Sequence, residues 1–190
     1  MNYQEKSFAN FSGLADLSPA LLENHLTLYK GYVTNTNKLS DLLKSMESES
    51  KTTTPEYAEI KRRFGWEWNG MRLHELYFEN VSTDTTEPQS DIKDMLTAEF
   101  GSVEAWSESF RAMGTMRGIG WVILYYDVEN NRLFNQWINE HDVSHLSGLK
   151  PLLVMDVFEH AFMLDFGLKR ADYVNFFMTH INWSIVSGRI

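Results

Sequence analysis

The first half of the chain carries hydrophobic residues at steps of three and four, the spacing typical of amphipathic helices. Ser18 and Pro19 provide a helix cap and a helix start. The stripe that follows, to about Leu43, consists of Leu21, His25, Leu28, Tyr32, Asn35, Leu39 and Leu42. A second stripe after Pro55 consists of Tyr57, Ile60, Phe64, Trp68, Met71, His74 and Phe78. Because only the polar residues 44–54 separate the two, the pattern predicts an antiparallel hairpin of two long helices.

The second half of the chain changes its pattern. Two shorter helical stretches come first, and aromatic and β-branched runs then predict three strands. Two further helices are predicted at the end, the last with a break near residues 179–182. In order, these elements are the helices 91–100 and 102–116, the strands 121–126, 132–138 and 151–155, and the helices 157–166 and 171–186.

Helices, a small sheet and further helices in succession indicate an α+β fold. Residues 82–90 are rich in Ser, Thr, Asp, Glu and Pro, which is typical of a linker. We therefore expect an N-terminal helical hairpin domain over residues 1–84. A C-terminal mixed α/β domain with a small three-stranded antiparallel sheet should occupy residues 91–190.

Composition excludes several classes of protein. Hydrophobic residues make up 43% of the chain, which suits a folded core, and no apolar run approaches the ~20 residues that span a bilayer. The absence of cysteine excludes disulfides, zinc–thiolate sites, iron–sulfur clusters and cysteine nucleophiles. A net charge of −9 argues against a nucleic-acid partner. Without a visible secretory signal, we expect a cytoplasmic protein that binds neither membrane nor nucleic acid.

Three histidines and one aspartate are the candidates for a functional site. His25 and His74 lie on the apolar stripes of the two predicted helices, where each needs a hydrogen bond or a metal. Asp156 ends a buried strand and His160 follows one helical turn later, so both can point at one place. Hydrogen-bonded core histidines are the plainer interpretation. Three imidazoles and a carboxylate that met would suit Fe, Mn or Zn and be too rich in nitrogen for Mg or Ca.

Other kinds of site are missing from the sequence. It contains no G-x-S-x-G, Walker loop, G-x-G-x-x-G or H-E-x-x-H motif. Phe78 stands where the second histidine of the last motif would follow His74-Glu75.

Asp156–Phe162 reads D-V-F-E-H-A-F and resembles the D-x-W-E-H-A-[YF] signature of iron/manganese superoxide dismutases. The resemblance extends over nearly the whole chain, through residues 17–39, 73–78, 100–102, 118–121, 148–153 and 182–183. It implies an antioxidant oxidoreductase that disproportionates superoxide to dioxygen and hydrogen peroxide. It also implies one Fe or Mn ion held by His25, His74, Asp156 and His160.

The same resemblance assigns roles to other residues. His141 matches the group that hydrogen-bonds the metal-bound solvent, and Tyr32 matches a gateway tyrosine that relays protons. Trp121 matches a pocket aromatic, and Arg170 matches an arginine that offers attraction to an anion. Because the net charge of −9 opposes an anionic substrate, we expect Lys30 as well as Arg170 to supply local positive charge. Glu159 matches a residue that reaches across a subunit interface, so a homodimer or a tetramer is implied.

The chain also departs from the family's pattern. An ungapped alignment puts Asn24 at the first ligand position, but we expect His25, because it lies on the stripe and amides are poor ligands for transition metals. Tyr29 stands where a histidine is usual, Phe158 replaces Trp, and Met163 replaces a Tyr that normally pairs with that histidine. Two alternatives therefore stay open: a non-catalytic structural or interaction protein with this fold, and another mononuclear Fe/Mn oxidoreductase.

Overall fold

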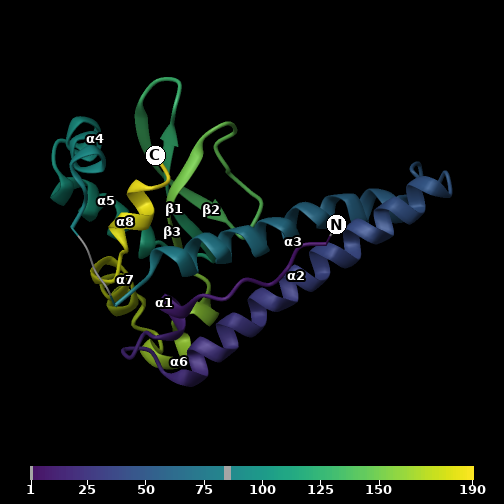
Figure 1. Cartoon of the computed structure of the whole chain (residues 1–190), viewed down its shortest axis with the longest axis horizontal. Helices are drawn as coiled ribbons and strands as arrows, with labels where there is room; N and C mark the ends of the chain where they lie inside the picture. Colours follow the sequence, from purple (N-terminus) through teal and green to yellow (C-terminus); the bar gives the residue numbers. More distant parts are fainter. Residues whose placement is uncertain (1, 84–86) are drawn as a thin grey trace.

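Two long helices dominate the N-terminal half of the protein. The structure, a computed structural model, describes residues 2–83 and 87–190. Helix α2 (Pro19–Ser48) and helix α3 (Pro55–Asn80) run antiparallel as a hairpin whose tip projects far from the rest of the molecule (Figure 1). Each helix begins with a proline, and the hydroxyl before it accepts a backbone N–H, in α2 from Leu21 at 3.1 Å. Both predicted helix starts and the hairpin are confirmed.

The predicted stripe of α2 is wrong in its detail. Leu28 and Leu42 are 41% and 40% exposed. The buried positions of the helix are Leu21, Leu22, His25, Tyr29, Val33, Thr36, Leu43 and Met46. The sequence pattern misleads because exposed leucines are common on folded surfaces. The helix also continues five residues past its predicted end at Leu43, through Lys, Met and Glu, which favour helix.

A three-stranded antiparallel sheet forms the centre of the second half, as predicted. Its strands are β1 (Gly120–Asp127), β2 (Arg132–Asn139) and β3 (Lys150–Asp156), in the order β2-β1-β3. The central strand β1 is buried along nearly its whole length. Its register sets Trp121 opposite Asp156, so the two side chains start from neighbouring positions in the sheet.

Short helices complete the fold around the sheet (Figure 1). They are α1 (Ala9–Ser12), α4 (Ser90–Phe100), α5 (Val103–Gly114), η1 (Glu159–Ala161), α6 (Met163–Phe166), α7 (Arg170–Thr179) and α8 (Trp183–Ser187). The predicted break near residues 179–182 is present between α7 and α8. None of the described helices has the length and hydrophobicity that crossing a bilayer needs.

The single helix predicted over residues 157–166 is wrong. The chain instead forms the 3-10 turn η1, a break at Phe162 with φ −143°, and then α6. The Asp156 carboxylate accepts the Phe158 N–H at 2.8 Å. This bond holds the strand end in a turn, which competes with helix.

One hydrophobic core connects the two halves of the chain. Tyr77 of α3 and Tyr173 of α7 are both fully buried in it, with their hydroxyl oxygens 3.2 Å apart. The predicted boundary falls partly on residues 84–86, outside the described residues. The division into domains 1–84 and 91–190 stays a prediction.

Candidate metal centre

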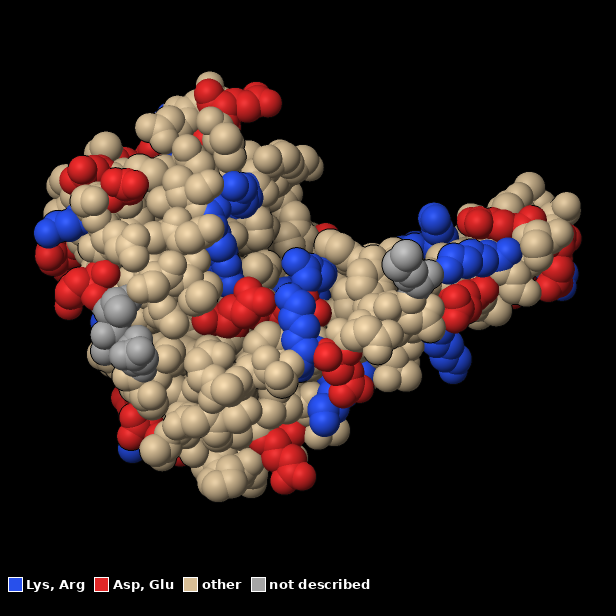
Figure 2. Space-filling view, viewed as in Figure 1, with Lys and Arg blue, Asp and Glu red and all other residues tan. Residues whose placement is uncertain are grey.

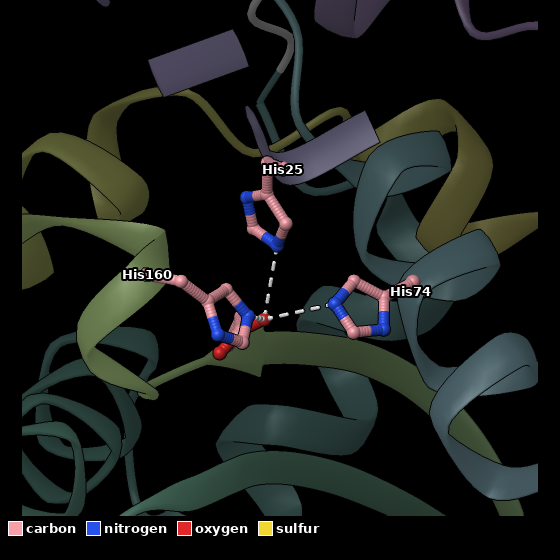
Figure 3. A group of neighbouring side chains, drawn as sticks. His25, His74 and His160 are labelled. Atoms are coloured by element: carbon pink, nitrogen blue, oxygen red, sulfur yellow. Dashed lines mark hydrogen bonds and ion pairs between the residues drawn. The ribbon is translucent and has the colours of Figure 1, made fainter. Parts of the chain in front are cut away.

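Four side chains from separate elements meet beside the sheet. Figure 3 shows His25 from α2, His74 from α3 and His160 from η1 pointing toward one another. Asp156 comes from the end of β3. One donor atom from each lies within 4.8 Å of the others. The Oδ2 atom of Asp156 is 3.1 Å from Nε2 of His25, 3.1 Å from Nε2 of His160 and 3.6 Å from Nε2 of His74. The structure thus brings together residues that are up to 135 positions apart, from 25 to 160.

Local contacts fix the carboxylate end of this cluster. The main chain after β3 is held by the Val157 N–H, which donates to the Gly120 carbonyl at 2.9 Å. The Tyr173 hydroxyl donates to the Asp156 carbonyl at 2.6 Å. With the Phe158 bond to the carboxylate, these contacts set both the backbone and the side chain of Asp156. A rigid carboxylate is what a metal ligand requires.

Three of the four side chains in the cluster are fully buried, and its carboxylate is ionised. His25, His74 and Asp156 are fully buried, whereas the side chain of His160 is 23% exposed. Burial lowers the pKa of His25 and holds the pKa of His74 well below its usual range. Burial alone would raise the pKa of Asp156, but interactions with His160 and His25 outweigh it and lower that pKa. At neutral pH the imidazoles of His25 and His74 are therefore neutral and the Asp156 carboxylate is ionised, which are the forms that bind metals.

The hydrogen bonding of His74 leaves a lone pair that suits a cation. Its Nδ1 lies 2.6 Å from the Gly70 carbonyl, which can only accept, so Nδ1 carries the hydrogen and Nε2 carries a lone pair. This Nε2 is buried, has no hydrogen-bond partner within residues 2–83 and 87–190, and faces a carboxylate oxygen 3.6 Å away. Two electron-rich atoms face each other without a proton between them. A metal ion would relieve this, and the donor set suits Fe, Mn or Zn.

His25, and not Asn24, belongs to this cluster. The ring of His25 lies 4.9 Å from that of His160 and 5.2 Å from that of His74, centroid to centroid. Asn24 is exposed and lines an outer groove with Glu159 and Met163. The geometry therefore agrees with the helical stripe, which predicts His25 as the first ligand, and not with the ungapped alignment, which puts Asn24 there.

The comparisons with known proteins give the family. Residues 88–189 match the family model described as "Iron/manganese superoxide dismutases, C-terminal domain". "Superoxide dismutase [Fe]" of Cupriavidus metallidurans is 35% identical over 93% of this chain and 89% of that protein. "Superoxide dismutase [Fe]" of Aquifex pyrophilus is 32% identical, over 93% of this chain and 85% of its own length. "Superoxide dismutase [Mn] 2" of Haloferax volcanii is 32% identical over 87% of this chain and 82% of that protein.

The chain belongs to the iron/manganese superoxide dismutase family. The resemblance seen in the sequence is thereby confirmed. Its curated relatives are named for iron in some cases and for manganese in others, so membership of the family covers both metals.

In this member of the family, His141, Tyr32 and Trp121 form a connected group beside the cluster. The Trp121 indole N–H donates to Nδ1 of His141 at 3.0 Å, and Nε2 of His141 lies 2.7 Å from the Tyr32 hydroxyl. The rings of Tyr32 and Trp121 lie 5.2 and 5.0 Å from that of His74. Burial lowers the pKa of His141 to about 4, so it is neutral at pH 7 and carries its hydrogen on Nε2. His141 therefore donates to Tyr32.

The remaining predicted residues lie farther out. Arg170 is half-buried, donates from Nη1 to the Gly118 carbonyl at 2.8 Å and packs over Trp137 and Phe162. Lys30 is exposed. Because it lies two residues before Tyr32 on helix α2, its side chain points to the opposite side of the helix from Tyr32.

Trp66 is a residue of the site that sequence reasoning missed. Its ring centroid lies 4.7 Å from that of His141, and the Arg63 guanidinium lies 4.8 Å above it. Trp66 escapes notice because it lies off the predicted stripe, which runs through Phe64 and Trp68. Its one signal is its place on α3 eight residues before His74, about two helical turns.

Gly70 makes room for Tyr32. A Cβ at position 70 would lie 2.5 Å from Cδ1 of the Tyr32 ring, so Gly70→Ala should push that ring aside. We expect a loss of about 1–3 kcal/mol in the free energy of unfolding, as overpacking of a filled space usually causes. A longer Tyr32–His141 distance should accompany it. Denaturant unfolding and a crystal structure of the variant measure both effects.

Gly65→Ala is the matched control on the same helix. No atom lies within 4 Å of a Cβ placed at Gly65, so this change should stabilise the helix by ~0.5–1 kcal/mol. Equal effects of the two substitutions would show that helix propensity, and not contact with Tyr32, limits position 70.

Proposed function

We propose that this protein is a superoxide dismutase that holds one Fe or Mn ion through His25, His74, Asp156 and His160. One observation carries the proposal: the lone pair on the buried Nε2 of His74 faces the Asp156 carboxylate in a cluster of three imidazoles. The family membership supports the same reaction, since the curated relatives are named superoxide dismutases.

The bound metal would supply one-electron chemistry, accepting an electron from one superoxide and giving it to the next. The chain's own part begins with charge. Neutral imidazoles and one carboxylate offset only part of a metal ion's charge, which leaves the site attractive to an anion. Burial of His25, His74 and Asp156 keeps bulk water from these donor atoms.

The group of His141, Tyr32 and Trp121 would handle the protons. Because His141 donates to the Tyr32 oxygen, the tyrosine's own hydrogen remains free to point toward a substrate. Burial raises the pKa of Tyr32 to about 12, so this hydroxyl stays protonated at neutral pH. A protonated tyrosine beside the cluster can serve as the proton donor that peroxide formation requires.

Attraction of superoxide must overcome the net charge of −9. Figure 2 shows lysines and arginines interspersed with acidic residues on the face it draws. We assign the local attraction mainly to Arg170, whose charge interacts with that of Asp156. Arg63 lies over Trp66 next to His141, but its guanidinium is paired with the buried carboxylate of Glu67 at 2.7 Å. Burial is the main influence that raises the pKa of Tyr32, and there the charge of Glu67 opposes that of Arg63. Charges this close to a site escape most of the screening by salt.

We also propose that the protein is a cytoplasmic homodimer or tetramer. Glu159 is exposed beside His160 and Met163 in the outer groove. Nearby on the chain, Met163, Leu164 and Leu168 are exposed by 43%, 57% and 90%, an apolar surface that a second copy would cover.

The test of function is superoxide decay measured against metal content. Protein loaded with Fe or with Mn should consume superoxide in proportion to bound metal and release one peroxide for every two superoxide ions. A chain that binds no metal would indicate the structural or interaction protein. Bound metal without superoxide turnover would indicate another oxidoreductase.

A further inference from the structure

A second histidine holds the segment that carries His141. Nε2 of His145 lies 2.9 Å from the His141 carbonyl oxygen, which can only accept, so this nitrogen carries the hydrogen. Nδ1 of His145 then accepts from the Tyr125 hydroxyl at 2.7 Å. A chain of two hydrogen bonds thus runs from Tyr125 through His145 to the backbone of His141.

The segment between β2 and β3 needs such support. Glu140 and Ser144, on either side of His141, have φ values of +54° and +80°, in the left-handed region that L-residues seldom adopt. A single isolated bridge, between Asn139 and Val143, ties this bend to itself. The backbone that presents His141 is therefore held in a conformation that its own residues do not favour.

The central strand supplies the support at two points. Trp121 and Tyr125 are four residues apart on β1 and project from the same face. Trp121 bonds to the ring of His141, while Tyr125 acts through His145 on its main chain. Tyr125 is only 3% exposed, so its hydroxyl has a fixed place. The ring and the backbone of His141 are thereby tied to one rigid strand.

We propose that His145 and Tyr125 are positioning residues that fix the His141 ring against Tyr32. Neither touches the metal cluster in this arrangement; both act through His141. The effect on turnover rests on the proposed function, but the effect on the position of His141 does not.

The surroundings of the pair favour a local effect over collapse of the fold. Tyr125 and His145 line an open groove of about 600 Å³, together with Trp68 and Asn69. Water from this groove can take over the hydrogen bonds that a truncated side chain gives up. The variants should fold and should loosen mainly the segment that holds His141.

The readout is the indole ¹H–¹⁵N resonance of Trp121, whose N–H donates to His141. It is recorded on the metal-free full-length chain and assigned by its absence in Trp121→Phe. In His145→Ala and Tyr125→Phe the proton resonance should move upfield as the bond to His141 weakens. His145→Gln, whose amide can still donate to the His141 carbonyl, should restore much of the original position.

His180→Ala is the matched control. Like His145, His180 bonds from a ring nitrogen to the carbonyl four residues earlier, Phe176 at 2.8 Å, but its other nitrogen meets Asp16. This variant should leave the Trp121 resonance in place. An unchanged resonance in His145→Ala, or an equal shift in His180→Ala, would overturn the proposal. Should His145→Ala fail to fold, Tyr125→Phe and His145→Gln decide the matter in the same way.

With metal bound, turnover per ion should fall several-fold in His145→Ala and recover in His145→Gln. A shifted resonance in a chain without any dismutase turnover would uphold the positioning role and reject the proposed function. Failure of the positioning role and failure of the proposed dismutase function would therefore give different results.

Discussion

Replacing His160 by alanine is expected to abolish retention of Fe or Mn. The substitution removes one of three imidazoles that converge on Asp156, whose carboxylate is fully buried. Loss of groups that merely support a metal ligand weakens affinity 10–100-fold, so loss of a direct ligand should weaken it by more than ~100-fold. Metal per chain after dialysis against a chelator measures the effect, and the metal-dependent rise in Tm should disappear with it.

The control for this experiment is again a histidine outside the cluster. His180→Ala removes the same chemical group and should leave metal content unchanged, since His180 bonds to Asp16 and Phe176. Full occupancy in His160→Ala would defeat the assignment of this ligand.

Replacing His141 by alanine should have the opposite pattern: metal is retained while turnover falls. The four cluster residues are left intact, but Tyr32 loses the donor 2.7 Å away that orients its hydroxyl. Positioned proton transfer contributes about 10²–10⁴-fold to enzymatic rates, so we expect a loss of about 10²-fold or more in turnover per bound ion. Superoxide decay normalised to measured metal content gives this number.

The variant His141→Gln tests whether the hydrogen bonds made at position 141, and not only the volume of the side chain, support turnover. A glutamine amide can accept from Trp121 and donate to Tyr32, as His141 does, and should retain part of the activity. A His141→Ala enzyme with the original rate per ion would remove His141 and its contact with Tyr32 from the proposed proton path.

Local chemistry explains which parts of the structure the sequence could predict. The starts of α2 and α3 follow from a hydroxyl residue and a proline in succession, a signal that depends on neighbouring residues alone. The strands follow from apolar runs, and the four cluster residues from a family signature with histidines on two helical stripes. These features require no knowledge of which surfaces meet.

Tertiary contacts explain the rest. Helical structure in the stretch expected over 157–166 begins only at Glu159, because the Asp156 carboxylate holds the Phe158 N–H in a turn, a contact that periodicity does not reveal. The contact of Trp66 with His141 joins residues 75 positions apart, from 66 to 141, with no motif to mark it. The link from His145 to Tyr125 likewise depends on how the segment after β2 folds back on β1.

The choice between Asn24 and His25 shows where sequence and structure complement each other. An alignment without a gap predicts Asn24 at the first ligand position, whereas helical periodicity predicts His25. The structure brings the ring of His25 to 3.1 Å from the Asp156 carboxylate and leaves Asn24 exposed.

Anomalous diffraction at the Fe and Mn absorption edges, on crystals of the full chain purified without added metal, tests the central claim most directly. We predict one strong anomalous peak per chain. The ion that it locates should lie within bonding distance of Nε2 of His25, His74 and His160 and of Oδ2 of Asp156. An ion located elsewhere, or one bound here with His25 beyond bonding distance, would contradict the proposed metal centre.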